Sequence, residues 1–173
     1  MLEAIENCAC RLGVPIIVKE VGAGIEPSSA KKLMAASVEW REVVGRDGTS
    51  SASIELARKG SISEQEIAAP FINWGMDTVD LLTTVHKACP ITGLIGSGGV
   101  RHGLNIACCI RLGASMTALA KPFLAPALKS TEAVIDKITI LQEQLRWTMF
   151  LTGSKRCQNY VLLLCNRTIF NSD

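Results

Sequence analysis

The residues best suited to chemistry form one short segment, 94–103, in which an apolar run leads into glycines and then into a helical pattern. Gly98 and Gly99 let the backbone approach a ligand closely, because glycine has no Cβ. The N–H groups at a helix start attract anions, and Arg101 adds a forked cationic donor. A simple tight turn is the alternative, but it requires neither several glycines nor an arginine. The segment therefore predicts a phosphate site.

A second apolar run, 115–119, also leads into a polar loop, which contains Ala120 and Lys121. In (β/α)₈ barrels, the loops after the seventh and eighth strands commonly share one phosphate site. Two such loops on one rim would make the strand at Pro15 the fifth. We therefore predict an α/β fold, the carboxyl-terminal half (strands 5–8) of a (β/α)₈ TIM barrel over residues 1–155, followed by a divergent tail over 156–173. A flavodoxin-like open sheet is the alternative.

Two further residues are candidate contacts for a ligand. Lys19 follows the apolar run 15–18, at the carboxyl end of a predicted strand, where barrel enzymes place their working residues. Its amine can donate to an electron-rich ring or a carbonyl, and a salt bridge to Glu20 is the alternative. Thr49 follows the loop 45–48, where a solvated turn explains it equally well.

The elements that position these residues alternate along the chain. Short continuous apolar runs predict strands covered on both faces, and helical spacing of apolar residues predicts helices. Helices are expected at 2–12, 27–36, 50–69 with a break near residue 60, 78–87, 104–112 and 131–151, and strands at 15–18, 38–44, 91–96 and 115–119. Glu39, Arg41 and Glu42 make the second strand a poor one. The alternation favours a parallel sheet with right-handed crossovers.

Composition excludes several classes of function. Of 173 residues, 48% are apolar and 20% charged, which indicates a globular protein, and a net charge of +2 with 5% aromatics argues against nucleic-acid binding. We expect no signal peptide, because the first residues are acidic and lack an apolar run, and no membrane-spanning segment, because no apolar stretch is long enough. The seven cysteines lack zinc spacing, so we expect reduced thiols in a cytoplasmic protein.

Several segments together point to a known family. They are 14–22 (VPIIVKEVG), 45–49 (GRDGT), 73–75 (NWG), 96–104 (GSGGVRHGL) and 149–154 (MFLTGS). In this order they resemble the type 2 isopentenyl diphosphate isomerases, over residues 2–155. The glycine–arginine segment alone is shared with FMN-dependent α-hydroxy-acid oxidases and related barrels.

The resemblance implies a flavoprotein that interconverts isopentenyl and dimethylallyl diphosphate. In that family reduced FMN takes part in proton transfer, NADPH keeps the flavin reduced, and Mg²⁺ holds the small-molecule diphosphate. By this resemblance Lys19 contacts the flavin ring and Thr49 lies beside the cofactor. The residues expected around the FMN phosphate are Gly98, Gly99, Arg101, Ala120 and Lys121.

The sequence also departs from that family. The family's segment with the metal-binding Glu and the catalytic-site Gln has no counterpart here, so we assign no catalytic or metal-binding residue and expect the chain alone to lack isomerase activity. Four single positions differ as well: Val44 replaces a small or hydroxylated residue, Asp47 a glycine, Asp77 a proline and Asn105 an aspartate.

Alternatives remain open for function and for partners. An open half-barrel leaves strand edges and apolar surface exposed, which favours a homo-oligomer or pairing with a separate amino-terminal half. An FMN-dependent α-hydroxy-acid oxidase is one other function. That chemistry typically uses a His base near an Arg, and His102 lies on the helix side of Arg101, where it is badly placed. A non-catalytic half-barrel assembly module is the other.

Overall fold

The computed structural model describes residues 1–48, 50–59, 61–90 and 93–157. Within them the helices are α1 (Leu2–Arg11), α2 (Pro27–Ala35), α3 (Ser51–Lys59), α4 (Ile62–Ala68), the 3₁₀ helix η1 (Ala69–Phe71), α5 (Thr78–Ala88), α6 (Gly103–Arg111), α7 (Lys121–Lys129) and α8 (Thr131–Leu151). The strands are β1 (Ile17–Lys19), β2 (Trp40–Val43), β3 (Gly93–Gly96) and β4 (Met116–Thr117).

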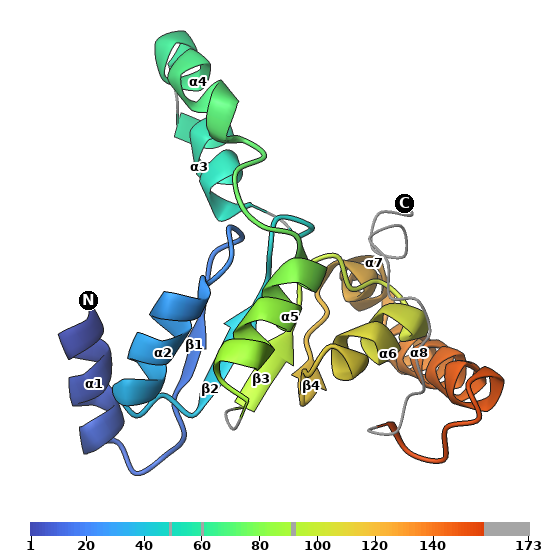
Figure 1. Cartoon of the computed structure of the whole chain (residues 1–173). Helices are drawn as coiled ribbons and strands as arrows, with labels where there is room; N and C mark the ends of the chain where they lie inside the picture. Colours follow the sequence, from blue (N-terminus) through green and yellow to red (C-terminus); the bar gives the residue numbers. More distant parts are fainter. Residues whose placement is uncertain (49, 60, 91–92, 158–173) are drawn as a thin grey trace.

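The strands form one parallel sheet in the order β1-β2-β3-β4 (Figure 1). Each strand therefore pairs with the next strand along the chain, and the order never reverses. A flavodoxin-like sheet reverses its order at a switch point, so that alternative is wrong for the described sheet. The chain has an α/β fold with a parallel sheet, as the alternation of elements predicts.

The two faces of the sheet have different surroundings. Helices α2, α5 and α6 contribute to the buried core on one face, where Val43 and Leu94 belong to the same apolar cluster as Leu82 and Cys109. This face also holds Arg41, whose side chain is fully buried.

The opposite face carries the alternate residues of each strand. One row across the sheet consists of Lys19, Glu42, Ile95 and Met116, which are partners in the strand register. Ile17 and Met116 on this face are 54% and 45% exposed. Ile95 in the same row is only 8% exposed, so exposed apolar side chains occur at both edges of this face.

Two helical parts lie outside the sheet layer. Helices α3 and α4 with η1 form an arm that projects from the sheet (Figure 1). Helix α8 packs against α6 and α7 and has the bounds expected from its apolar pattern. Helix α7 is absent from the sequence-based expectation, because Pro122 and Pro126 argue against a helix. Pro122 lies in the first turn, where its missing N–H costs nothing.

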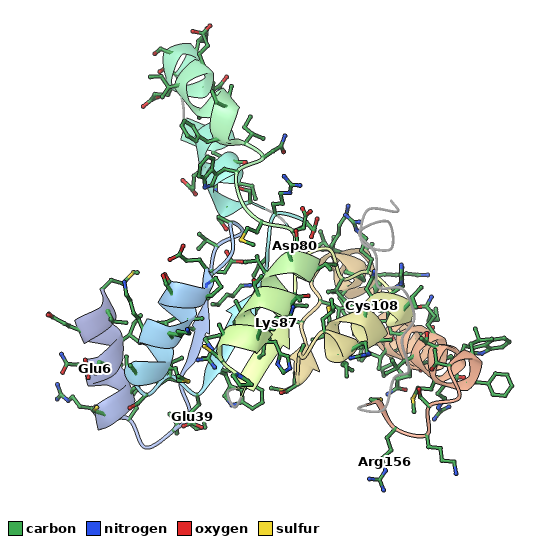
Figure 2. All side chains as sticks on the ribbon, viewed as in Figure 1. Glu6, Glu39, Asp80, Lys87, Cys108 and Arg156 are labelled. Atoms are coloured by element: carbon green, nitrogen blue, oxygen red, sulfur yellow. The ribbon has the colours of Figure 1, made fainter. Side chains whose placement is uncertain are left out.

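Figure 2 shows how the side chains are distributed over these elements. Exposed apolar side chains occur on α4, after η1 and on α8, including Ile62, Trp74, Trp147 and Phe150. In the described part of the chain, no helix combines the length and the apolar character that crossing a membrane demands.

Candidate functional site

A cavity of about 500 Å³ lies at the carboxyl ends of the strands. It brings together residues from all four strand ends, because parallel strands present those ends on one edge of the sheet. Its lining comprises Lys19, Glu42, Val44, Asp47, Gly48, Ser97, Gly98, Gly99, Val100, Arg101, Ala118, Leu119, Ala120 and Lys121. Six of the seven sequence-based candidates are in this list. The seventh, Thr49, lies outside the described residues.

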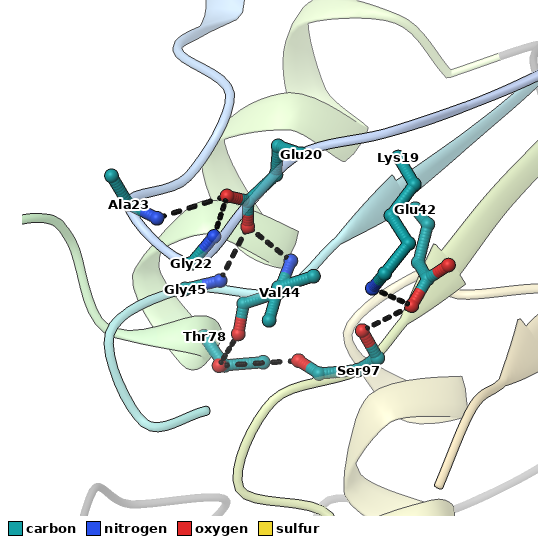
Figure 3. Close-up of polar contacts among 9 residues, drawn as sticks. All are labelled: Lys19, Glu20, Gly22, Ala23, Glu42, Val44, Gly45, Thr78 and Ser97. Carbon is teal, nitrogen blue, oxygen red and sulfur yellow. Dashed lines mark hydrogen bonds and ion pairs between the residues drawn. The ribbon is translucent and has the colours of Figure 1, made fainter. Parts of the chain in front are cut away.

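Lys19 pairs with Glu42 and not with Glu20. Its Nζ donates to Glu42 Oε1 at 2.6 Å, and the hydroxyl of Ser97 donates to the same oxygen at 2.8 Å (Figure 3). Successive side chains of a strand point to opposite faces, so Glu20 cannot reach the face that Lys19 occupies. The salt bridge considered from sequence therefore exists with a different partner.

Glu20 instead joins two loops through backbone contacts. Its Oε2 accepts hydrogen bonds from the backbone N–H groups of Gly22 and Ala23, at 2.5 and 2.9 Å. Its Oε1 accepts from the N–H groups of Val44 and Gly45, at 2.7 and 2.9 Å. Figure 3 shows the carboxylate between the loop after β1 and the loop after β2. A single side chain thus joins the loop after β1 to the loop after β2, and the second of these loops borders the cavity.

These contacts change the ionisation of Glu20. Burial acts to raise the pKa of the carboxyl, but backbone hydrogen bonds from Gly24, Gly22, Ala23 and Val44 together outweigh it and lower the pKa below its ordinary value. Hydrogen bonds to a carboxylate favour the charged form. Glu20 is therefore anionic near neutral pH.

The glycine loop after β3 has the backbone that the sequence implies, for a different reason. Gly98 and Gly99 have φ of +78° and +71°, which favours glycine. A Cβ at Gly98 would overlap the carbonyl oxygen of Val44. Close packing against Val44, the residue that follows β2, therefore requires this glycine, and no ligand is needed to explain it.

The start of α6 is not the open anion site expected from sequence. Asn105 Oδ1 accepts hydrogen bonds from the N–H groups of Arg101 and His102, at 3.0 and 3.2 Å. Gln144 Oε1 accepts from the N–H of Gly103 at 2.8 Å. Protein atoms thus occupy these donors. Asn105, the departure from an aspartate in the family, works as a capping acceptor through its amide oxygen.

The start of α7 also lies at the cavity and carries the partial positive charge of a helix N-terminus. Ala120 is its N-cap residue and makes no side-chain capping bond, and Lys121 is its first residue. Both line the cavity together with Arg101. Barrel phosphate sites often include the N-terminus of a short extra helix after the eighth strand. The described residues therefore bring three cationic side chains, a glycine loop and a helix start together around one space.

Asp47 and Asp77, two other departures from the family pattern, connect the loop after β2 with the start of α5. Asp47 Oδ2 accepts a hydrogen bond from the N–H of Thr78, at 2.7 Å, at the start of α5. Asp77 pairs with Nε of Arg46, and the bonds of Asp77 raise the pKa of that guanidinium. Asp47 thus brings a negative charge to the cavity wall, but its carboxylate is engaged by the helix start.

His102 lies at a different cavity. It caps α6 through Nδ1, which accepts from the N–H of Asn105. Burial first, then the charges of Arg101 and Lys137, lower the pKa of His102. The residue borders an apolar groove with Leu104 and α8, apart from the lining of the first cavity. Among the described residues, no group of three or more His, Cys, Asp or Glu side chains is arranged to hold a metal ion.

Comparison with known proteins places the chain in a family. Residues 72–163, more than half of the sequence, match the family model described as FMN-dependent dehydrogenase. The chain belongs to the FMN-dependent dehydrogenase family. Within the matched range lie the glycine loop, α7 and the whole of α8.

Curated relatives of this FMN-dependent dehydrogenase family member carry a more specific name. An isopentenyl-diphosphate delta-isomerase of Stutzerimonas stutzeri is 46% identical over 154 residues, covering 89% of this chain and 44% of the relative. A protein of the same name from Nostoc is 39% identical, with the same coverage. The chain thus spans less than half the length of the curated relatives it matches. The resemblance drawn from the sequence segments is confirmed.

A solved structure supports the fold. The crystal structure of mandelate oxidase aligns with a TM-score of 0.66 and 18% identity, over 91% of this chain and 39% of that one. At this identity the likeness concerns the fold alone. The alignment again covers only part of the longer protein.

Proposed function

We propose that this chain binds FMN in the cavity at the carboxyl ends of its strands, as the phosphate-holding half of an isopentenyl-diphosphate delta-isomerase. The observation that carries the proposal is the convergence of Arg101, Lys121 and the Gly98–Gly99 loop on the cavity that Lys19 also borders. FMN has a dianionic phosphate at one end and a ring with carbonyl and nitrogen hydrogen-bond acceptors at the other, so this set of donors fits it.

Each residue has a role that follows from its chemistry. The guanidinium of Arg101 and the ammonium of Lys121 would hold the phosphate, with N–H groups of the glycine loop and the start of α7. Lys19 would donate to the ring, and Thr49 is proposed beside the cofactor from the resemblance. The flavin, when bound and reduced, supplies the proton-transfer chemistry implied by the family.

The architecture proposed is the carboxyl-terminal half of a (β/α)₈ barrel, with β1–β4 as its strands 5–8. Residues 1–155 would form this half and 156–173 a divergent tail. The sequential strand order and the exposed inner face with Ile17 and Met116 support the proposal. NADPH as reductant and Mg²⁺ for the diphosphate substrate are proposed from the resemblance. Buried thiols at Cys89, Cys108 and Cys109 fit the reducing cytoplasm.

The proposed barrel half needs a partner for its open side. A second copy of the chain or an amino-terminal half would cover the exposed apolar face. Sedimentation velocity distinguishes the first from the second. We expect concentration-dependent self-association of the purified chain, whereas a monomer over the accessible concentration range would favour pairing with a separate half.

Two other functions have less support. An α-hydroxy-acid oxidase needs a His base at the cofactor, and His102 is engaged as the cap of α6 at another cavity. A non-catalytic half-barrel assembly module would be silent by itself and would pair with a separate amino-terminal half. Isomerase activity that appears only when the chain is mixed with the amino-terminal half of a relative would distinguish that module from a decayed enzyme.

Substitution of the phosphate contacts tests FMN binding directly. We expect Arg101→Gln to weaken FMN binding about tenfold to hundredfold, because a charge-assisted hydrogen bond to phosphate is lost. Lys129→Gln, at the opposite end of α7, removes the same charge away from the cavity and serves as the control. Equal FMN affinity of the Arg101 and Lys129 variants, measured by quenching of flavin fluorescence, would refute the proposed phosphate site.

A further inference from the structure

Glu42 is one of two carboxylates that line the cavity, the other being that of Asp47. It lies on β2, in the register row between Lys19 on β1 and Ile95 on β3. Its side chain is 14% exposed, against 57% for that of Lys19. A carboxylate this enclosed needs partners, since burying an unpaired charge is costly.

The partners of Glu42 come from two different strands. Oε1 accepts from Lys19 Nζ and from Ser97 Oγ, so one oxygen joins three neighbouring strand ends (Figure 3). Ser97 is buried and directly precedes Gly98. The carboxylate therefore connects the lysine at one side of the cavity with the glycine loop at the other.

We propose that Glu42 is a positioning residue of this site, which holds the Lys19 amine against the cavity wall where the flavin ring would lie. The inference rests on the proposed FMN site. An unpaired lysine of this exposure samples many rotamers, because its charge sits on a flexible four-carbon stem. The bond to Glu42 uses one of its three N–H donors and leaves two for a ligand.

The ion pair of Lys19 and Glu42 also gives the charged groups of the cavity different roles. The charge of Lys19 is offset by Glu42, so the pair attracts an anion weakly, whereas Arg101 and Lys121 carry the positive charge for the phosphate. Because Lys19 is largely exposed, the pair adds little to folding stability. The ion pair fixes the direction of the Lys19 amine. Loss of Glu42 should therefore affect ligand binding more than folding.

The first test needs no cofactor. Acetic anhydride labelling, read by mass spectrometry, compares Lys19 with exposed Lys129 in the full chain. An amine bonded to a carboxylate is a poorer nucleophile than a free one. We expect Glu42→Gln to raise the ratio of Lys19 to Lys129 labelling about threefold or more, as the ion pair is lost. Glu39→Gln changes an exposed carboxylate at the edge of the molecule and should leave the ratio unchanged (Figure 2). An unchanged ratio in Glu42→Gln would overturn the proposal.

The second test is a double-mutant cycle on FMN affinity. Glu42→Gln should weaken FMN binding about fivefold when Lys19 is present, through loss of one well-placed hydrogen bond. In the Lys19→Met background the same change should not weaken binding, because no amine remains to be positioned. Equal weakening in both backgrounds would show a merely structural role and refute the proposal. If wild-type protein binds no FMN, the proposed function fails, and the labelling ratio alone decides whether Glu42 holds Lys19.

Discussion

Glu20→Gln is expected to destabilise the fold strongly, although the substitution keeps the shape of the side chain. The carboxylate accepts four backbone hydrogen bonds, two on each oxygen, from the loops after β1 and β2. A glutamine amide retains one accepting oxygen and turns N–H donors toward the other two backbone N–H groups. Two charge-assisted bonds are lost, and two partly buried donors are left without acceptors.

The magnitude follows from these four contacts. A hydrogen bond to a charged group contributes about 1.5–3 kcal/mol, and the remaining bonds lose the benefit of the charge. Partial exposure of Glu20 lets water replace some of this, so we expect a loss of about 3 kcal/mol. For a protein of this size, such a loss lowers Tm by roughly 6–12 °C.

The dependence on pH separates the charge of Glu20 from its packing. The folded-state pKa is lowered from the ordinary value of 4.5, so the carboxylate stabilises the fold fully above that pH. This stabilisation is lost as the pH falls below 4.5 and through the lowered pKa, because the folded state must then take up a proton. The difference between wild type and Glu20→Gln should therefore be constant around neutral pH and shrink in acid.

Urea denaturation at several pH values measures this difference. Glu6→Gln is the matched control, since Glu6 is an exposed carboxylate on α1 (Figure 2). A loss for Glu20→Gln no greater than for Glu6→Gln would refute the reasoning. A loss that stays the same down to acid pH would assign the effect to packing and not to charge.

Three other substitutions test separate features of the fold. Arg41→Met should stabilise the protein by about 2 kcal/mol in urea denaturation, because the buried guanidinium has no hydrogen-bond partner in the described structure; a destabilisation would indicate that a partner exists. Gly98→Ala should lower the free energy of unfolding by about 3 kcal/mol or more, since its Cβ would overlap the carbonyl of Val44. Gly153 also has a positive φ but faces open space, so Gly153→Ala should lower it by only about 1 kcal/mol. Equal losses in the two variants would contradict the close packing. Asn105→Ala should lower the free energy of unfolding by about 2 kcal/mol, measured by thermal denaturation, because it removes the acceptor at the start of α6. Asn105→Asp should retain most of the wild-type stability, since a carboxylate oxygen can accept the same bonds. An aspartate variant as unstable as the alanine variant would argue against capping.

The sequence predicts the elements whose pattern is local. Helix α8 keeps its expected bounds because Ser130 accepts from the N–H of Ala133 at its start. The sequence predicts only a poor strand at 38–44, since Glu39, Arg41 and Glu42 are unusual in a covered strand, and the structure has β2 at Trp40–Val43. Both charges have a place that alternation explains: Arg41 faces the helices and Glu42 faces the cavity.

What could not be predicted depends on contacts between distant residues. The pairing of Lys19 with Glu42 follows from the strand register, which only the folded sheet defines. The occupied donors at the start of α6 depend partly on Gln144, a residue of α8. Local patterns carry no information about either contact. Helix α7 was missed because Pro126 inside it is a strong local signal against a helix.

The central claim is that the cavity recognises the phosphate of FMN, and one measurement tests it most directly. The full chain is titrated into FMN and, in parallel, into riboflavin, with quenching of flavin fluorescence as the signal. We expect FMN to bind at least about tenfold more tightly than riboflavin, because only FMN carries the phosphate that Arg101 and Lys121 would hold. Equal affinity for the two flavins, or binding of neither by the folded chain, would contradict the account.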